Sequence, residues 1–448
     1  LRRNLAIHIT PAPAQKRLTL LTQRLNQQQR FPAIVYVTLQ QTAEEVATAL
    51  GKAGLNARAY HAGLPDDVRS EVQDGFMNGS VDIIVATIAF GMGIDKANIR
   101  SVYHYNLPKS LENYQQEIGR AGRDGKGSHC ELLACADDLV VLQNFVFGDT
   151  PTPAALRLVV DNLLRQGPEF DISRYDLAHS TDIRPLVLET VLTYLELDGV
   201  LSPLGAFYTS YQVRFVHGEA KMLAGHKPER QDFLRRVFGS GKKGFKYTTL
   251  NVDEAAEVTN EPRERILKAL GWLEEAGEIQ CKPAGLRHRF RLCEDATHRD
   301  PATICQKMQQ LFAERENKDA GRLERVMALA SDPGCTTRHL LHYFGEEMGE
   351  DCGTCGNCVA SKGTEKKPVI EIPRSPEPPI TVEHIGMIQD LHRQGHASLR
   401  APRQLARFLC GIASPATSRA KLSKHDAFAM LDRVPFQKVL AQAESMVL

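Results

Sequence analysis

Two arginines in the first third of the chain have the type and spacing for gripping a phosphate. Arg120 and Arg123 lie three positions apart, and Gly119 and Gly122 precede them within the run GRAGR. Guanidinium groups bind phosphate through paired hydrogen bonds, and glycines allow a ligand to approach the backbone closely. The pattern predicts a phosphate site. The alternative is a surface helix with two solvated arginines.

Four of the ten cysteines have the spacing of metal ligands, C-x16-C-x2-C-x2-C, while the other six are scattered singly. Two-residue gaps let successive thiolates converge on one ion, and four sulfurs suit tetrahedral Zn²⁺ in a closed, structural site. An iron–sulfur cluster is the main alternative. The pattern is typical of a reducing compartment and not of a disulfide framework. The predicted ligands are Cys335, Cys352, Cys355 and Cys358.

Alternating strands and helices must position the two arginines. Strand patterns at 5–9, 33–38, 57–61, 81–87, 101–105 and 128–134 alternate with helical patterns. This alternation predicts an α/β lobe, a parallel sheet with helices on both faces. Ser110 is a candidate cap for a helix over 111–121, at whose end Gln116, Arg120 and Arg123 come together.

Polar residues follow several of these strands. In parallel sheets the functional residues lie in loops beyond the carboxyl ends of the strands, so we expect these side chains to share one surface. For each threonine among them, a local cap or turn is the alternative role. The residues are Thr38, His61, Gly63, Thr87 and Asp95.

The stretch 86–125 resembles the fifth and sixth motifs of superfamily 2 helicases, and GMGID followed by QEIGRAGRDG is similar to the RecQ form. The resemblance implies that residues 1–148 are the second RecA-like lobe of a RecQ helicase. It implies that Arg123, as an arginine finger, and Arg120 reach the γ-phosphate of ATP across the cleft between two lobes. It further implies ATP contacts by Gly93, Asp95 and Gln116, and contacts to one DNA strand by Thr38, His61, Gly63 and Thr87.

Two segments mimic the motifs that would hold ATP and Mg²⁺. In 239–244 Lys242 is not followed by Ser or Thr, and 253–256 (DEAA) opens an amphipathic helix instead of ending a buried strand. We therefore expect the chain to be the back portion of a longer helicase, inactive as an ATPase alone, with ATP and Mg²⁺ bound mainly by an absent lobe. The alternative function is a non-enzymatic DNA-binding protein with a degenerate lobe.

Residues 150–300 contain an internal duplication. Asp176 and Pro185 recur as Asp253 and Pro262 at an offset of 77. Each copy predicts two helices and a two-stranded wing, the winged-helix pattern, over 149–217 and 218–300, with wing turns at 203–205 and 284–285. Arg287 and Arg289 on the second wing are candidate DNA contacts, although many winged helices only pack against neighbours. Trp272 is expected in the core.

The remaining segments complete the predicted order. The zinc module spans 301–360 and resembles that of RecQ proteins, a proline-rich linker spans 361–380, and a helical domain spans 381–448. Between 391 and 425 there are seven Lys or Arg and no Asp or Glu. This indicates a nucleic-acid surface or a solvated face. Placing two winged helices before the zinc site is similar to the Rothmund–Thomson-type branch of the RecQ family.

A net charge of +1 predicts that any nucleic-acid surface is local, and no apolar run is long enough to span a membrane. The resemblance implies 3′ to 5′ translocation with ATP, single-stranded DNA and single-strand/duplex junctions as partners. We expect a monomer that works with other repair proteins and no membrane. We expect it in the bacterial cytoplasm with the nucleoid, or in a eukaryotic nucleus.

Overall fold

The computed structural model describes residues 2–91, 94–362 and 370–447, which form two compact units. The first comprises Leu1–Thr150, Ala313–Ala413 and Thr417–Leu448, and the second comprises Pro151–Phe312 and Ser414–Ala416. Helix α14 (Pro301–Ser331) contributes residues to both. Within the described ranges, no helix combines the length and the apolar character needed to cross a membrane.

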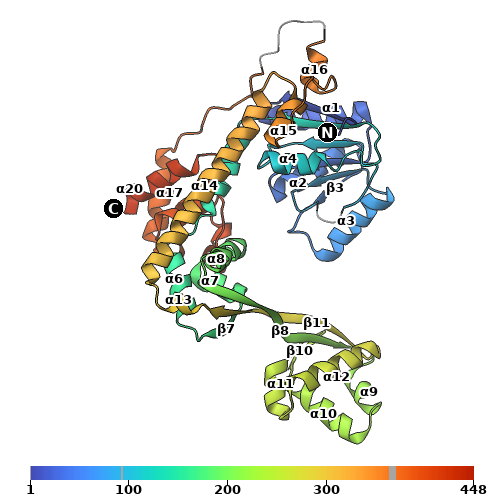
Figure 1. Ribbon diagram of the computed structural model, residues 1–448, viewed down its shortest axis with the longest axis vertical. Helices are drawn as coiled ribbons and strands as arrows, with labels where there is room; N and C mark the ends of the chain where they lie inside the picture. The colour runs from blue at the N-terminus through green and yellow to red at the C-terminus, as the bar shows by residue number, and fades with distance from the viewer. Residues whose placement is uncertain (1, 92–93, 363–369, 448) are drawn as a thin grey trace. The chain divides into compact units, whose positions relative to one another are not determined.

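The first unit is built on a six-stranded sheet with the order β1-β6-β5-β2-β4-β3, in which every pair of neighbours is parallel (Figure 1). This confirms the predicted α/β lobe. The strands are β1 (Leu5–Pro11), β2 (Ala33–Tyr36), β3 (Ala57–Tyr60), β4 (Ile83–Ala86), β5 (Ser101–His104) and β6 (Ser128–Ala134).

Helices cover both faces of this sheet, and alternate strand residues serve the two cores. Ile83 and Val85 of β4 join one core with α1 and α2, while Ile84 joins the other core with α3 and α4. Ser110 caps α4 by accepting the Asn113 N–H at 3.2 Å, as predicted, although α4 ends earlier than expected. The helices are α1 (Ala14–Gln28), α2 (Gln40–Lys52), α3 (Asp66–Asn78), α4 (Leu111–Ile118) and α5 (Asp138–Gly148).

The cysteine segment follows α14, whose Leu323, Val326 and Leu329 are buried in the core shared with α4. It contains α15 (Thr336–Tyr343) and α16 (Gly356–Ala360). Residues 370–380, the described part of the linker, form no helix or strand, but Ser375 donates backbone and hydroxyl hydrogen bonds to Asp137 at 2.6 and 2.7 Å.

The C-terminal segment is helical, as predicted, and Phe147 of α5 packs against its core. Part of the basic stretch has an internal structural role: Arg403 binds Glu316 at 2.9 Å, Arg407 donates to the Thr150 carbonyl at 2.6 Å, and Arg393 pairs with Asp390. The elements are α17 (Val382–Arg393), η1 (Ala397–Leu399), α18 (Pro402–Leu409), α19 (Pro415–Arg419), η2 (Leu422–Lys424) and α20 (Phe436–Val447).

The second unit contains the duplication. Its elements are α6 (Pro153–Leu164), β7 (Glu169–Ile172), α7 (Arg174–Thr181), α8 (Pro185–Leu197), β8 (Leu201–Phe215), α9 (Glu219–Ala224), α10 (Pro228–Gly239), β9 (Lys242–Lys243), β10 (Thr248–Asn251), α11 (Val252–Thr259), α12 (Arg263–Glu275), β11 (Ile279–Leu292) and α13 (Glu294–Thr297). The helix pairs α7–α8 and α11–α12 repeat with equal lengths, and each pair turns at a left-handed residue, Asp182 (φ 54°) or Asn260 (φ 52°). The repeat is therefore structural.

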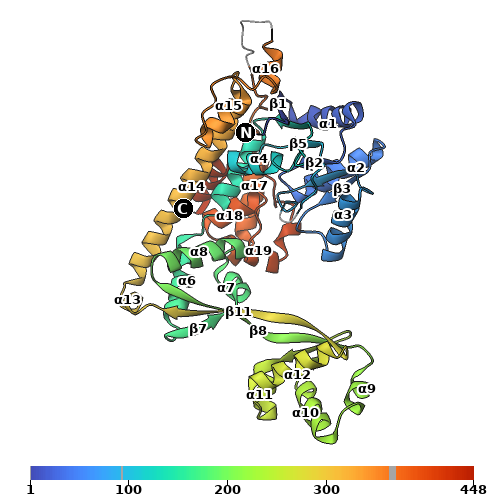
Figure 2. The ribbon, with the colours of Figure 1, turned by 45° about the vertical axis from the view of Figure 1, so that its right-hand side comes forward.

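The two predicted wing turns are wrong. β8 and β11 are continuous strands that pair antiparallel along their length, forming a ribbon with a helix pair at each end (Figures 1 and 2). The turn expected at 203–205 is a register shift in the ribbon, and Gly285 is a positive-φ residue (65°) within β11. Each helix pair therefore packs beside one strand from each copy. Trp272 is also not core: it is 43% exposed, with the Arg230 guanidinium carbon 3.7 Å from its ring centre.

Candidate functional site

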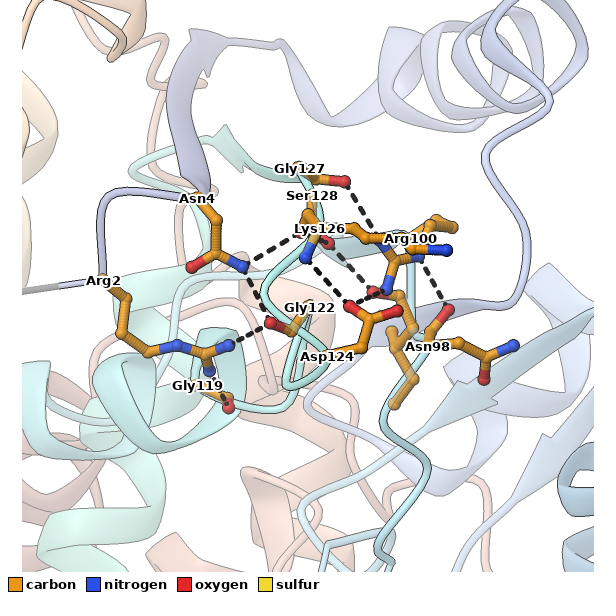
Figure 3. A network of polar contacts seen from close by, with 11 residues as sticks. Arg2, Asn4, Asn98, Arg100, Gly119, Gly122, Asp124, Lys126, Gly127 and Ser128 are labelled. Atoms are coloured by element: carbon orange, nitrogen blue, oxygen red, sulfur yellow. Dashed lines mark hydrogen bonds and ion pairs between the residues drawn. The ribbon is translucent and has the colours of Figure 1, made fainter.

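The loop that carries the two arginines, 119–127, is held by residues that are distant in sequence (Figure 3). Arg2 donates to the Gly119 carbonyl at 2.7 Å, and Asn4 donates to the carbonyls of Gly122 and Lys126 at 2.7 and 3.0 Å. Gly122 has φ +55°, and a Cβ there would lie 2.6 Å from Asn4 Nδ2. Glycine is thus required by both backbone conformation and space.

A second set of contacts fixes the far side of the loop (Figure 3). Arg100 donates to Asp124 at 2.6 Å, to the Asn98 carbonyl at 2.8 Å and to the Gly127 carbonyl at 3.2 Å. Sequence reasoning missed Arg2, Asn4 and Arg100. Their signal is weak, because ordinary polar residues outside the motif make these contacts to backbone carbonyls.

The two arginines of the motif occupy different environments. Arg123 is 39% exposed and donates to Asp95 at 2.7 Å, so two predicted ATP contacts lie together. Arg120 is 8% exposed and packs against Gly91, where a Cβ would lie 2.5 Å from Arg120 Nη2. Gln116 is exposed on α4, and the predicted residue Gly93 lies outside the described residues.

The predicted DNA contacts lie beyond the carboxyl ends of the strands. Thr38 and Thr87 line one hollow together with Asn106 and Lys109. Gly63 lies nearby, since a Cβ there would be 2.4 Å from Gln40 Oε1, at the start of the helix that follows Thr38. The His61 side chain is buried and contacts Glu44 at 3.1 Å, so it is oriented toward α2.

A buried ion pair next to this hollow fixes residues that line it. Arg17 and Asp138 pair at 2.7 Å with side chains only 6% and 7% exposed. Asp138 also accepts from Asn106 Nδ2 and the Leu107 N–H, each at 2.9 Å. Asn106 in turn accepts the Thr38 N–H at 3.2 Å. The ion pair therefore positions the Thr38 backbone, a role that sequence spacing does not reveal.

A second buried pair, His104–Glu117 at 2.7 Å, lines the same hollow and links it to α4, which carries Glu117. The Tyr36 ring stacks on His104 at 5.4 Å, and its hydroxyl donates to the Phe90 carbonyl at 3.1 Å. Burial, together with the Glu117 carboxylate, raises the pKa of Tyr36, so its hydroxyl stays protonated and remains a donor.

The four predicted metal ligands converge. Their Sγ atoms lie within 4.8 Å of one another, with Cys335–Cys355 at 4.0 Å and Cys352–Cys358 at 3.9 Å. Four sulfurs about 2.3 Å from a tetrahedral Zn²⁺ lie about 3.8 Å apart, so the cluster fits this ion. Cys335 and Cys355 are also N-caps of α15 and α16, where the helix dipole favours a thiolate.

Hydrogen bonds prepare one of these thiols for metal binding. Burial works to raise the pKa of Cys352, but hydrogen bonds from Thr337, Thr354 and the Cys355 N–H bring it down to about 6. A thiol with this pKa is largely ionised at neutral pH, as a metal ligand must be. The cysteine segment contacts the lobe directly: the Tyr343 hydroxyl donates to Glu112 of α4 at 2.8 Å.

In the second unit, the two predicted DNA-binding arginines differ. Arg287 pairs with Asp171, whose carbonyl it also binds at 2.9 Å, so its charge is offset. Arg289 has no ion pair within the described residues and lies over Phe207, 4.9 Å from the ring centre. Arg263 lies over the same ring at 5.6 Å. These side chains line a hollow of about 1010 Å³ along the ribbon.

Comparison with known proteins identifies two parts of the chain. The helicase conserved C-terminal domain matches residues 16–125, and the RecQ zinc-binding domain matches residues 298–359. In these two parts the chain is similar to proteins of the RecQ family. The four-cysteine cluster is accordingly a structural zinc site. The Rothmund–Thomson branch stays a prediction.

Three relatives show how far the likeness extends. The RecQ-like DNA helicase blm-1 of Caenorhabditis elegans is 40% identical over 164 residues, 37% of this chain and 17% of the relative. ATP-dependent DNA helicase Q5 of Rattus norvegicus is 51% identical over 105 residues, 23% of this chain and 11% of the relative. ATP-dependent DNA helicase RecQ of Bacillus subtilis is 49% identical over 108 residues, 24% of this chain and 18% of the relative. The chain thus matches less than a fifth of the length of each of these RecQ proteins.

Proposed function

We propose that this chain is part of an ATP-dependent DNA helicase, which moves 3′ to 5′ along single-stranded DNA and unwinds duplexes in repair, recombination or replication. One observation carries the proposal most directly. The segment between β4 and β5 begins at the hollow, with Thr87, and continues to Asp95, which binds Arg123 at 2.7 Å. A single segment thus connects the surface suited to DNA with the arginine suited to a nucleotide.

In this mechanism Arg123 leaves Asp95 and donates to the γ-phosphate of ATP, which a preceding lobe holds with Mg²⁺. Its guanidinium stabilises the charge that develops on the transferred phosphoryl group. Thr38 and Thr87 donate their hydroxyls to phosphates of one DNA strand. Because Thr87 and Asp95 belong to the same segment, the exchange of Asp95 for the γ-phosphate couples hydrolysis to movement along the strand.

The second unit supplies a further DNA surface in this proposal. Arg289 is the better candidate for a phosphate contact, because Asp171 already binds Arg287. We propose that the ribbon hollow receives DNA at a single-strand/duplex junction. Affinity should fall steeply with salt, because lysine and arginine contacts release counterions from the phosphates. A salt-insensitive affinity would count against phosphate contacts.

The direct test is Arg123→Ala in the protein that includes an upstream lobe. We expect ATP hydrolysis stimulated by single-stranded DNA in the wild type and a loss of roughly 10³–10⁵-fold in the variant. Arg69→Ala is the control, because Arg69 lies on α3 and its ion pair within the described residues is the local one with Asp66. Wild-type turnover in Arg123→Ala would refute the finger. Absence of any DNA-stimulated hydrolysis in the wild type would favour a non-enzymatic DNA-binding protein.

The remaining proposals concern the surroundings of the protein. We propose that it acts as a monomer, with the bacterial nucleoid or in a eukaryotic nucleus, and alongside other repair proteins. Sedimentation of the protein with and without a junction oligonucleotide tests the first point. A mass of two chains in the absence of DNA would contradict it.

A further inference from the structure

The hairpin between β9 and β10 carries a feature that the proposed helicase mechanism does not use. Lys242 and Lys243 of β9 pair with Thr249 and Thr248 of β10, and the Gly244 N–H donates to the Tyr247 carbonyl at 2.8 Å to close the tip. This is the glycine–lysine run that fails as a phosphate loop. β9 is the edge strand of its sheet, and every residue of 242–247 is exposed.

Phe245 stands at this tip with a relative exposure of 103%, the highest of any large apolar side chain in the described residues. Two other phenylalanines of the same unit, Phe238 and Phe290, are 0% and 1% exposed. Burying a phenyl ring stabilises a fold by about 1.5–3 kcal/mol, and Phe245 contributes nothing of this kind. Its ring is therefore available to a ligand.

Three lysines share the hairpin with Phe245. Lys242 and Lys246 form no ion pair within the described part of the chain, while Lys243 binds Glu219 at 2.8 Å. A flat apolar surface between free cations is complementary to a nucleobase whose neighbouring phosphates are anionic. Aromatic side chains stack on bases of any sequence, and lysines supply the backbone contacts.

We propose that Phe245 is a stacking platform for an unpaired base of single-stranded DNA, with Lys242 and Lys246 on the flanking phosphates. The inference rests on the proposed function, because it assumes that the chain binds DNA. A single strand is the fitting ligand, since the faces of duplex bases are already covered by their neighbours, while a ring at a hairpin tip offers its whole face. The site lies outside the ribbon strands and outside the hollow that Thr38 and Thr87 line.

Changing this residue should leave the fold intact. The buried residues of the hairpin are Thr248 and Leu250 on β10, and Leu250 belongs to the core of α10–α12. Phe245 lies beyond this core. Substitutions at exposed sites usually change stability by no more than about 0.5 kcal/mol, so differences in binding report on the site itself.

The experiment uses the chain with thymidine oligonucleotides, each carrying one 2-aminopurine, whose fluorescence reports base stacking. At one probe position the wild type should change the fluorescence, and Phe245→Ala should abolish that change and weaken binding about 5- to 150-fold, equivalent to ~1–3 kcal/mol. Phe245→Trp should retain both the fluorescence change and the wild-type affinity. Lys246→Ala should lower the salt dependence by about one phosphate contact and keep the fluorescence change.

Tyr175→Ala is the matched control, an aromatic residue of the same unit that is 66% exposed and whose ring lies against that of His179, tilted by 36°. It should behave as the wild type. If Phe245→Ala matches the wild type in affinity and at every probe position, the stacking site is refuted while DNA binding by the chain stands. If the wild type binds no DNA, the proposed function fails together with this site.

Discussion

Removing the Asp138 carboxylate should destabilise the first unit and loosen the hollow around Thr38. Its two oxygens accept four hydrogen bonds, two from Arg17 at 2.7 and 2.9 Å and one each from Asn106 and the Leu107 N–H at 2.9 Å. In Asp138→Ala the Arg17 charge stays buried without its partner. Breaking a buried pair on one side costs about 3–5 kcal/mol.

Hydrogen exchange measured by mass spectrometry suits this test, because it reports each unit separately. Amides of β2 and α5 that exchange through global opening of the first unit should exchange about 10²–10⁴-fold faster in Asp138→Ala, the rate equivalent of that free energy. The second unit should be unchanged. Replacing both partners, in Arg17→Met with Asp138→Leu, should restore much of the protection, because no buried charge is then left alone.

Asp137→Ala is the matched control, an acidic neighbour whose side chain contacts Ser375 of the linker. It should change exchange in the core of the first unit by no more than the equivalent of about 1 kcal/mol. If Asp138→Ala exchanged no faster than Asp137→Ala, the ion pair would not carry the stability assigned to it. The positioning role of Asn106 would then lose its basis as well.

Three further outcomes follow from the same structure. Chelation, or Cys355→Ser, should remove about one zinc per chain and unfold α15 and α16, as metal analysis and hydrogen exchange would show, whereas iron would contradict the site. Gly122→Ala should destabilise loop 119–127 by about 1–3 kcal/mol, because φ is +55°, while Gly127→Ala, with no neighbour within 4 Å of a Cβ, should not. Burial works to raise the pKa of Glu131, but hydrogen bonds from His129 and Thr10 lower it overall. The ionised Glu131 therefore adds to the free energy of unfolding above about pH 4.3, and this contribution is lost as the pH falls through the folded-state pKa. In Glu131→Gln the free energy of unfolding should depend less on pH in that range.

The sheet could be predicted because each strand is specified locally. The runs at β2 and β4 are short, apolar and bounded by turn residues, and both are fully buried, as parallel strands between two helix layers must be. The zinc ligands could be predicted equally well, because three of the four lie within seven residues, Cys352 to Cys358. In both cases the information lies within a few residues of the feature.

The ribbon could not be predicted by the same reasoning. Pro-Leu-Gly at 203–205 and Ala-Gly at 284–285 are local turn signals, but the same residues also fit a strand irregularity. The choice depends on whether β8 pairs with itself in a hairpin or with β11, whose first residue lies 78 positions after that of β8. Pairing over that distance depends on the packing of both helix pairs. The environment of Trp272 could not be predicted for a related reason. Its ring is not in the core but lies against the guanidinium group of Arg230 on α10.

The two motif arginines have separate tasks because their surroundings differ. Arg120 is buried against Gly91, where any larger residue would meet its guanidinium, so it fixes the segment after β4 to the end of α4. Asp95 of the same segment pairs with Arg123. The Arg123–Asp95 pair is exposed at 39% and 85%, and exposed pairs contribute only about 0–1 kcal/mol, so a phosphate can displace Asp95 at little cost. Asp95→Asn should accordingly leave the exchange rates of the first unit unchanged, while Arg120→Ala should increase them, and equal effects would contradict this division.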